Sequence, residues 1–194
     1  SPEAYFVHTP GLKVVIPSNP FDAKGLLIAS IRDNNPIVFL EPKRVYRAAK
    51  GDVPKGDYTV KLGEAIVVRE GSNVTMITYG AMVHNVLEAA EAANREDDID
   101  AEVIDLRTLL PFDIQTILTS VEKTGRVIIV HEAPKTCGFG AELSATLNEK
   151  ALLHLQAPIL RVTGFDTPFP YIYENEYLPN KKRLRKALLD TVNF

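Results

Sequence analysis

RVIIVHEAPKTCGFGAE, residues 126–142, is the stretch that decides the fold. It opens with an unbroken run of valine and isoleucine, passes His131 and Glu132, and reaches two glycines before an amphipathic segment begins. A strand that is buried on both faces has this continuous apolar composition, whereas a strand with one wet face alternates apolar and polar residues. The stretch therefore predicts a buried strand at residues 126–130, a turn, and a helix at residues 140–155.

The same alternation of apolar strands and amphipathic helices extends from residue 64 to the C-terminal end. Further strands are expected at Glu64–Arg69, Val74–Thr78, Ala101–Asp105 and Ile159–Val162, and further helices at Ala81–Arg95, Asp113–Lys123 and Asn180–Val192. Asp113 is a suitable N-cap residue, and Gly125 is suited to end the same helix. Strands that alternate with helices in this way form a mainly parallel sheet covered by helices, so the predicted fold class is α/β.

The first fifty residues contain a shorter version of this pattern. We expect strands at Leu12–Ile16 and Ile37–Leu40, with a helix at Pro20–Asp33 between them, because proline is favoured in a first helical turn. Residues 1–11, SPEAYFVHTPG, show no helix-start pattern.

Residues 48–60, AAKGDVPKGDYTV, differ in character from the segments on either side. They contain two glycines, a proline and several charges, with no apolar periodicity, which is typical of a linker. We place the linker at residues 51–60, between a first unit at residues 1–50 and a second at residues 61–194. Fifty residues are too few for a complete α/β domain, and the chain starts without an initiator methionine, so we expect it to be part of a longer protein.

The composition excludes several classes of function. The formal net charge of −3 gives no electrostatic basis for binding nucleic acid. No apolar run approaches the roughly 20 residues that a membrane-spanning helix needs. A single cysteine, Cys137, excludes an internal disulfide and a four-thiolate metal site.

Ligands of open parallel sheets bind beyond the carboxyl ends of the strands. This rule selects Tyr79-Gly80, Arg107-Thr108 and His131-Glu132. An imidazole beside a carboxylate could act as acid and base if a pocket faced the pair. The favoured alternative is structural, with His131 bonded to a loop carbonyl and Glu132 paired with a base.

The remaining candidate sites have weaker support. Gly138 and Gly140 lack the full spacing of a phosphate-binding loop, so they are expected to let a helix pack closely on the sheet. Cys137 is expected to be an ordinary loop thiol. The basic first half of the last helix is expected to be a solvated face, although it could reach an acidic partner. The other histidines are too widely spaced to form a zinc-ligand pair: His8, His84 and His154.

Several long motifs lie along the chain: SPEAYFVHTPGLKVVIPSNPFDAKGLL, ASIRDNNP, VFLEPKRVYRAA, TYGAMVH, VIDLRTLLPFD, KTGRVIIVHEAP and GFDTPFP. Together they resemble the beta subunit of thiamine-diphosphate-dependent 2-oxoacid dehydrogenases, and the similarity runs from Ser1 to Phe194. FLEPKRVYRAA, HEAP and GFDTPFP are closer to the branched-chain type than to the pyruvate type.

The resemblance implies a fold and a division of labour. It implies that residues 1–50 are the tail of a pyrimidine-binding α/β domain and that residues 61–194 form a transketolase C-terminal-type domain, a three-layer sandwich with a mainly parallel sheet. It also implies an enzyme subunit in an alpha2beta2 heterotetramer, which decarboxylates 2-oxoacids and transfers the acyl group to lipoyl groups. The diphosphate and magnesium would be held by the alpha subunit. The catalytic and cofactor-binding residues of the beta subunit precede the motifs matched here, so no catalytic or cofactor-binding residue is assigned.

Two further sites follow from the resemblance alone. A structural potassium site of the family corresponds to Ser30, Ile31, Asp33 and Asn35. The docking surface for the subunit-binding domain of the dihydrolipoyl acyltransferase corresponds to Gln156, where a glutamate is common, and Phe194. The implied location is the cytoplasm of a prokaryote or the mitochondrial matrix of a eukaryote.

Three alternatives stay open on sequence grounds. One is the beta subunit of pyruvate dehydrogenase, and another is a non-catalytic module for assembly and docking. The third is a relative of transketolase or deoxyxylulose-phosphate synthase, which the continuous match to beta-subunit motifs disfavours.

Overall fold

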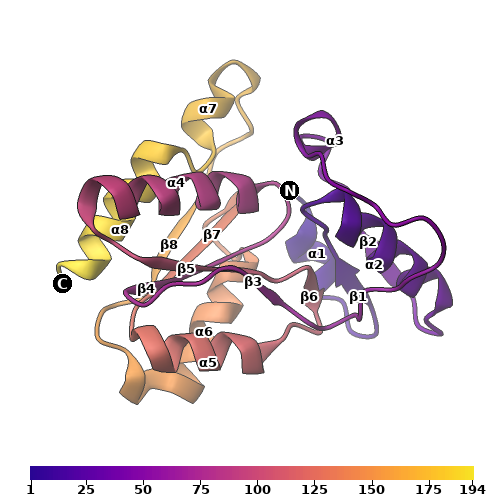
Figure 1. The fold of residues 1–194 in the computed structure, drawn as a ribbon, viewed down its shortest axis with the longest axis horizontal. Coiled ribbons are helices and arrows are strands. Elements are labelled where there is room, and N and C mark those ends of the chain that lie inside the picture. The colour runs from indigo at the N-terminus through magenta and orange to yellow at the C-terminus, as the bar shows by residue number, and fades with distance from the viewer.

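The computed structural model describes residues 1–194 and contains two sheets (Figure 1). The strands are β1 (Lys13–Val15), β2 (Ile37–Phe39), β3 (Ile66–Arg69), β4 (Val74–Thr78), β5 (Ala101–Asp105), β6 (Thr108–Leu110), β7 (Val127–Pro134) and β8 (Leu160–Gly164). The helices are α1 (Glu3–Val7), α2 (Pro20–Arg32), α3 (Val45–Ala48), α4 (Met82–Asp97), α5 (Ile114–Thr124), α6 (Phe139–Ala151), α7 (Glu174–Tyr177) and α8 (Lys181–Val192), with 3-10 turns η1 (Leu152–His154) and η2 (Tyr171–Tyr173).

The larger sheet has five strands in the order β3-β5-β4-β7-β8. All neighbouring pairs are parallel except β3 with β5, which is antiparallel at one edge. The central strand β4 places Met76 beside Val103 of β5 and Ile128 of β7, and all three side chains are fully buried. The predicted mainly parallel sheet is therefore confirmed, and burial on both faces explains the continuous apolar runs.

Helices cover both faces of this sheet and make three layers (Figure 1). On one face, α4 and α8 pack through residues such as Val86 and Leu188. On the other face, α5 and α6 pack through residues such as Ile117 and Leu143. Each face therefore has its own apolar core, and the predicted α/β sandwich is confirmed.

Helix ends follow the local chemistry of the sequence. The side chain of Asp113 accepts a hydrogen bond from the backbone N–H of Thr116 at 3.1 Å, and Gly125 ends α5 with a left-handed φ of 66°. Asn19 caps α2 and Asn180 caps α8 in the same way. The predicted N-cap and stop of α5 are confirmed, because orphan N–H groups and a left-handed turn favour these residue types.

The smaller sheet joins segments of the chain from before and after the linker. Its order is β2-β1-β6, with β1 parallel to β2 and antiparallel to β6. Strand β6 belongs to the chain after the linker, yet it pairs with a strand from the first fifty residues. The sequence did not indicate β6, because its pairing with β1, more than ninety positions earlier in the chain, is a tertiary contact that no local pattern records.

Some local expectations were wrong. Residues 1–11 were expected to lack a helix, but they form α1, where Glu3 and its contacts with the larger sheet stabilise a single short turn. Helices α3 and α7 were also not predicted, because each has only four residues. Residues 49–65 form no helix or strand, although Val60 is buried beside Val15 and Leu26.

None of the helices combines the length and the apolar character needed to cross a membrane.

Candidate functional site: the carboxyl edge of the larger sheet

The carboxyl ends of β4, β5 and β7 face the first residues of the chain. In Figure 1 the N-terminal end lies beside this edge of the larger sheet. Gly80 follows β4 with φ at 57°, and a Cβ at this position would lie 2.9 Å from the side chain of Ile16. The edge where sequence reasoning expected a ligand is therefore in close contact with another part of the same chain.

Glu3 and Tyr79 form a buried contact at the end of β4. The Tyr79 hydroxyl donates a hydrogen bond to Glu3 Oε1 at 2.8 Å, and Glu3 is only 1% exposed. Burial raises the pKa of the Glu3 carboxyl and also raises that of Tyr79 well above its usual value. Both groups therefore favour the neutral form at this interface.

His131 lies beside Tyr79, with ring centroids 6.2 Å apart, and is fully buried. Its Nε2 accepts a hydrogen bond from the backbone N–H of Gly140 at 3.3 Å. Burial lowers the pKa of the imidazole to about 4, so it is neutral at physiological pH. A Cβ on Gly138 or Gly140 would lie within 2.8 Å or 2.7 Å of the His131 ring, so both glycines permit the close packing that the sequence favoured.

The detailed partners expected for His131 and Glu132 were wrong. His131 Nε2 accepts from the backbone N–H of Gly140 in the first turn of α6, because α6 directs its first N–H groups toward β7. Glu132 accepts from the hydroxyl of Ser1 at 2.9 Å and pairs with no base. The pair does not converge on a shared substrate position, so it gives no geometry for acid–base catalysis.

A second cluster, the β5 polar network, consists of Ser18, Asp22, Asp105 and Arg107. The Ser18 hydroxyl donates to Asp105 Oδ2 at 2.5 Å, and the Arg107 backbone N–H donates to Asp105 Oδ1 at 3.1 Å. The Arg107 guanidinium forms an ion pair with Asp22 at 3.0 Å, with both side chains below 10% exposed. The network therefore joins the start of α2 to the end of β5.

Arg107 also links a third segment. Its guanidinium donates twice to the backbone oxygen of Glu64, at 3.1 Å and 2.9 Å, so its donors are directed to the protein interior. Removing one partner of a buried ion pair typically costs about 3–5 kcal/mol, because the other charge is left uncompensated. The network is thus a clamp between residues before and after the linker.

Asp105 is the most perturbed acid of this network. Burial raises the pKa of its carboxyl to about 7, although hydrogen bonds from Ser18 and the Arg107 backbone oppose the shift. Sequence reasoning selected Arg107 but missed Ser18, Asp22 and Asp105. An aspartate that ends an apolar strand buried on both faces was the available signal.

These residues do not fit a diphosphate group. The one guanidinium directed into the carboxyl edge, that of Arg107, is already paired with Asp22 and bonded to the Glu64 oxygen. The buried carboxyl groups of Glu3 and Asp105 supply no positive charge, so no free cation is left there to bind a polyanion. We therefore derive no step through thiamine diphosphate from this edge.

The four residues of the expected potassium site lie at the end of α2. Ser30 Oγ is buried without a hydrogen-bond partner, whereas Ile31 is 75% exposed. The Asp33 carboxylate accepts from Lys13 Nζ at 2.5 Å and from the backbone and side-chain nitrogens of Asn35, each at 2.8 Å. The Lys13 ammonium is the first cause that lowers the pKa of Asp33 to about 2. A cation at this helix end would therefore share Asp33 with Lys13.

The expected docking residues are both on the surface. Gln156 is exposed, its backbone N–H donates to the Gly125 oxygen at 2.7 Å, and its side chain lies over that glycine. Phe194 is 77% exposed after the end of α8.

The cysteine and the other histidines do not gather into a site. Cys137, His8 and His154 are exposed, and His84 contacts the Ser18 oxygen at 2.8 Å. No group of three or more histidine, cysteine or acidic side chains could hold a metal ion.

Comparisons with known families follow the same division of the chain. Residues 63–184 match the transketolase C-terminal domain, and residues 1–49 match the transketolase pyrimidine-binding domain. The first match includes more than half of the residues, so the chain belongs to the transketolase C-terminal domain family.

Among its relatives, the chain is most informatively compared with beta subunits of 2-oxoacid dehydrogenases. It is 56% identical over its whole length to the mitochondrial 2-oxoisovalerate dehydrogenase subunit beta of Dictyostelium discoideum, covering 52% of that protein. It is 52% identical to 2-oxoisovalerate dehydrogenase subunit beta 2 of Arabidopsis thaliana, covering 54% of it. It is 51% identical to the pyruvate dehydrogenase E1 component subunit beta of Bacillus subtilis, covering 59% of it and 99% of this chain. The chain thus spans little more than half the length of these relatives.

Solved structures support the fold. A split-gene transketolase, described as an inactive beta4 tetramer, superposes with a TM-score of 0.81 over 98% of this chain and 60% of the other, at 22% identity. A transketolase from Leishmania mexicana gives a TM-score of 0.63 over 98% of this chain and 27% of the other, at 15% identity. At these identities the likeness shows the fold alone.

The pKa shifts of Asp105 and His131 predict opposing effects of pH on stability. From about pH 4 to pH 7 the folded state retains the Asp105 proton that the unfolded chain has lost, so this group makes the free energy of unfolding fall as pH rises. From about pH 4 to pH 6.5 the unfolded chain binds a proton on His131 that the folded state excludes, so this group makes the free energy of unfolding rise with pH.

The variant Asp105→Asn should lack the contribution of Asp105 that lowers the free energy of unfolding as pH rises. Its free energy of unfolding relative to the unmodified protein should increase with pH in this window, by up to about 1.4 kcal/mol per pH unit, and level off above about pH 7.

Urea unfolding at several pH values from 4 to 8 measures this difference. The control is Gln115→Asn on the exposed side of α5, which exchanges one neutral amide for another and changes no titratable group, so its difference from the unmodified protein should be the same at every pH. Parallel stability profiles for Asp105→Asn and the unmodified protein would contradict the assignment to Asp105.

Proposed function

We propose that this chain is the C-terminal part of the beta subunit of a branched-chain 2-oxoacid dehydrogenase. The observation that supports this most directly is the 56% identity along the entire chain with a 2-oxoisovalerate dehydrogenase beta subunit. The pyruvate dehydrogenase beta subunit is the second candidate, because its 51% identity is only slightly lower. The reaction would be oxidative decarboxylation of the 2-oxoacid, followed by transfer of the acyl group to lipoyl groups.

In this proposal the chain contributes assembly and docking, and the reacting groups come from elsewhere in the enzyme. The cofactor supplies the decarboxylation chemistry, while the protein orients it and moves protons. Thiamine diphosphate and magnesium would be held by the alpha subunit together with parts of beta outside residues 1–194. The support from this chain is that its carboxyl edge is packed with carboxyl groups and its own first residues.

The domain organisation belongs to the same proposal. Residues 1–50 would be the tail of the pyrimidine-binding domain, 51–60 the linker and 61–194 the C-terminal domain. The family matches at residues 1–49 and 63–184 leave the linker unmatched, which supports this division. The β5 polar network would hold the two domains in one orientation.

The proposed partners are the alpha subunit and a second beta subunit in an alpha2beta2 heterotetramer. The location would be the mitochondrial matrix in a eukaryote, as the names of two relatives indicate, or the cytoplasm in a bacterium. Neither the proposed partners nor the proposed location depends on the polar side chains at the carboxyl edge of the larger sheet.

A complete alpha and beta pair tests the proposed reaction. With thiamine diphosphate and magnesium, the beta subunit that contains this chain should turn over 2-oxoisovalerate with a kcat/KM at least tenfold above that for pyruvate. A preference for pyruvate would favour the second candidate. The polypeptide of residues 1–194, mixed with the alpha subunit, should give no turnover above alpha alone, and clear turnover would contradict its proposed non-catalytic role.

We further propose that the end of α2 holds potassium through backbone oxygens of Ser30 and Ile31 and the side chains of Asp33 and Asn35. The unpartnered Ser30 hydroxyl and the free carbonyl groups of a helix end support this. Thermal unfolding in KCl should have a higher midpoint than in tetramethylammonium chloride at equal ionic strength. The difference should grow in Lys13→Met, because the competing ammonium is removed. Equal midpoints in both salts for both proteins would contradict the site.

We also propose that Gln156 and Phe194 belong to a docking surface for the subunit-binding domain of a dihydrolipoyl acyltransferase. A neutral Gln156 removes one carboxylate from that surface, so salt should weaken docking less than in a glutamate variant. Isothermal titration at two salt concentrations compares the protein with Gln156→Glu. Phe194→Ala should weaken docking in both backgrounds. Identical salt dependence of the two proteins would contradict a contact through residue 156.

A further inference from the structure

Two adjoining grooves run along the exposed side of α8, at the β8 edge of the larger sheet. One lies over the helix itself and the other between the helix and β8, and both include Lys186 and Asp190. We call them together the α8 groove. Its lining residues are Lys135, Ile159, Leu160, Arg161, Val162, Lys181, Lys182, Arg183, Arg185, Lys186, Ala187, Leu189 and Asp190. Neither Gln156 nor Phe194 is among them, so this surface differs from the docking surface proposed above.

The groove is strongly basic. Seven of its lining residues are cations and only Asp190 is an acid. Three of the cations are paired: Arg185 with Asp97 and Glu96, Lys186 with Asp190, and Lys181 with Glu96 at 3.7 Å. The four cations with no carboxylate within ion-pair distance are Lys135, Arg161, Lys182 and Arg183. The unbalanced charge is therefore local, in a chain whose formal net charge is −3.

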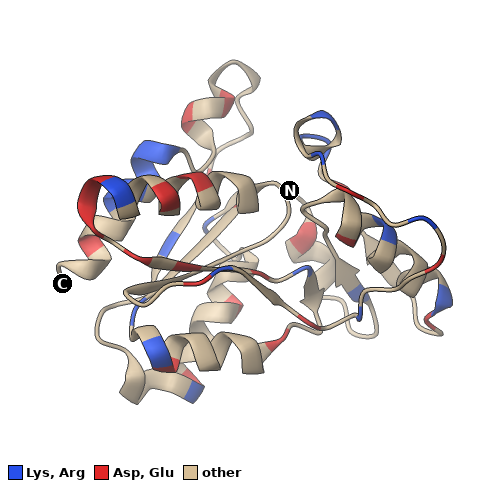
Figure 2. Cartoon of the chain, viewed as in Figure 1, with Lys and Arg blue, Asp and Glu red and all other residues tan.

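A solvated helix face does not account for this arrangement. Figure 2 shows that lysine and arginine gather in the first half of α8, and Lys181, Lys182 and Lys186 are exposed, as the sequence pattern alone would predict. Lys135, however, follows β7 and Arg161 belongs to β8, so three separate elements bring cations to one groove. Arg161 is held in place by a hydrogen bond to the Lys135 oxygen at 3.1 Å. Independent elements that converge in this way indicate a binding surface better than a run of lysines on one helix.

The floor of the groove is apolar and only partly exposed. Ile159 and Leu160 line it from the β8 side and are half-buried, whereas Val162 of β8 and Ala187 of α8 are buried. At one end, the Arg183 guanidinium donates to the Thr163 and Tyr177 backbone oxygens and stacks on Phe165 at 4.3 Å. A fixed guanidinium loses little conformational entropy when it contacts a ligand. The groove thus combines an apolar floor with a cationic rim that is partly preorganised.

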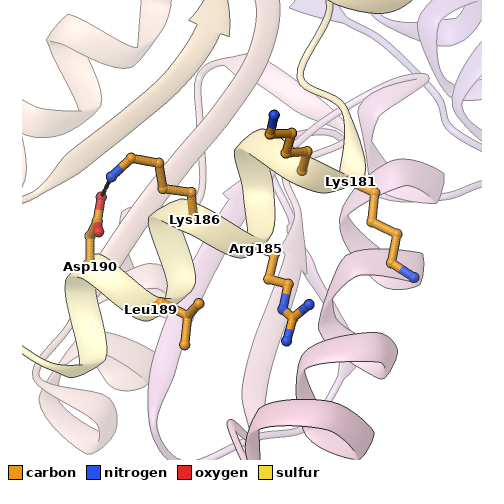
Figure 3. A pocket seen from close by; sticks show the side chains of 6 residues that line it. Lys181, Arg185, Lys186, Leu189 and Asp190 are labelled. Carbon is orange, nitrogen blue, oxygen red and sulfur yellow. Dashed lines mark hydrogen bonds and ion pairs between the residues drawn. The ribbon is translucent and has the colours of Figure 1, made fainter.

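We infer that the α8 groove binds an extended acidic segment of a partner protein, with apolar side chains on the floor and carboxylates toward the cationic rim. Figure 3 shows that the side chains diverge along the helix, with Lys186 toward Asp190 on one side and Arg185 and Leu189 on another. Such an open, elongated surface does not surround a small anion, but it suits a chain that alternates carboxylates and apolar residues. Nucleic acid is disfavoured, because Glu96 and Asp97 of α4 lie beside the cations and would repel a long polyanion.

The probe for this surface is a fluorescein-labelled octapeptide of alternating leucine and glutamate. It should bind the full chain with an affinity that falls as salt rises, measured by fluorescence anisotropy. The charge reversals Lys135→Glu and Lys182→Glu, combined in one variant, should weaken binding at least tenfold. Both lysines are exposed and make no ion pair, and a glutamate at residue 182 suits the first turn of α8, so the variant should keep its fold.

A matched control is Lys55→Glu, an exposed lysine of the linker, which should change the affinity less than twofold. A peptide with glutamine in place of glutamate should bind at least tenfold more weakly. Undetectable binding of the acidic peptide, or equal affinity for the double variant, would overturn the inference. Displacement of the peptide by pyrophosphate at micromolar concentration would also overturn it, in favour of a small-anion site. Tighter binding of a random-sequence DNA oligonucleotide than of the peptide would overturn it in favour of nucleic acid.

Discussion

The buried ion pair between Arg107 and Asp22 is the interaction on which the arrangement of the whole chain depends. Arg107 follows β5 with a left-handed φ of 55°, which turns the chain out of the larger sheet and into β6. The same residue reaches back to α2 and to the Glu64 oxygen. Because two charges buried out of water must be compensated by each other, α2 and β5 have few alternative positions.

The contacts of Arg107 with Asp22 and the Glu64 oxygen lie at the edge of the sheet where α/β proteins usually bind ligands. The carboxyl ends of parallel strands offer free backbone groups and side chains around a crevice. Here Glu3, Ser18 and Asp22 occupy that crevice, and the neutral His131 packs against two glycines. The carboxyl edge of the larger sheet has therefore become an interface inside the chain.

The sequence predicted the features that depend on local chemistry and missed those that depend on distant contacts. The run VIIV, the Asp113 cap and the Gly125 stop each reflect burial or backbone geometry within a few residues, and all three are confirmed. Strand β6 and helix α1 were missed because they depend on distant contacts, with β1 and with Tyr79, that no local pattern records. The β5 polar network joins residues more than eighty positions apart, and no spacing rule relates Ser18 to Asp105. The strand before His131 and Glu132 was predicted to end at residue 130, but β7 continues to Pro134 and includes both residues. Their side-chain partners come from α6 and Ser1, which strand patterns do not describe.

The pairing of β6 with β1 also bears on what the linker contributes to holding residues 1–50 and residues 61–194 together. Residues 49–65 form no helix or strand, whereas the contacts that join the parts are a shared sheet, a buried ion pair and the packing of Gly80 against Ile16. A break in the linker would therefore leave two pieces that still recognise each other through a complementary strand and opposite charges. In this respect the protein resembles a split protein whose halves reassociate, and the linker mainly raises the local concentration of one half around the other.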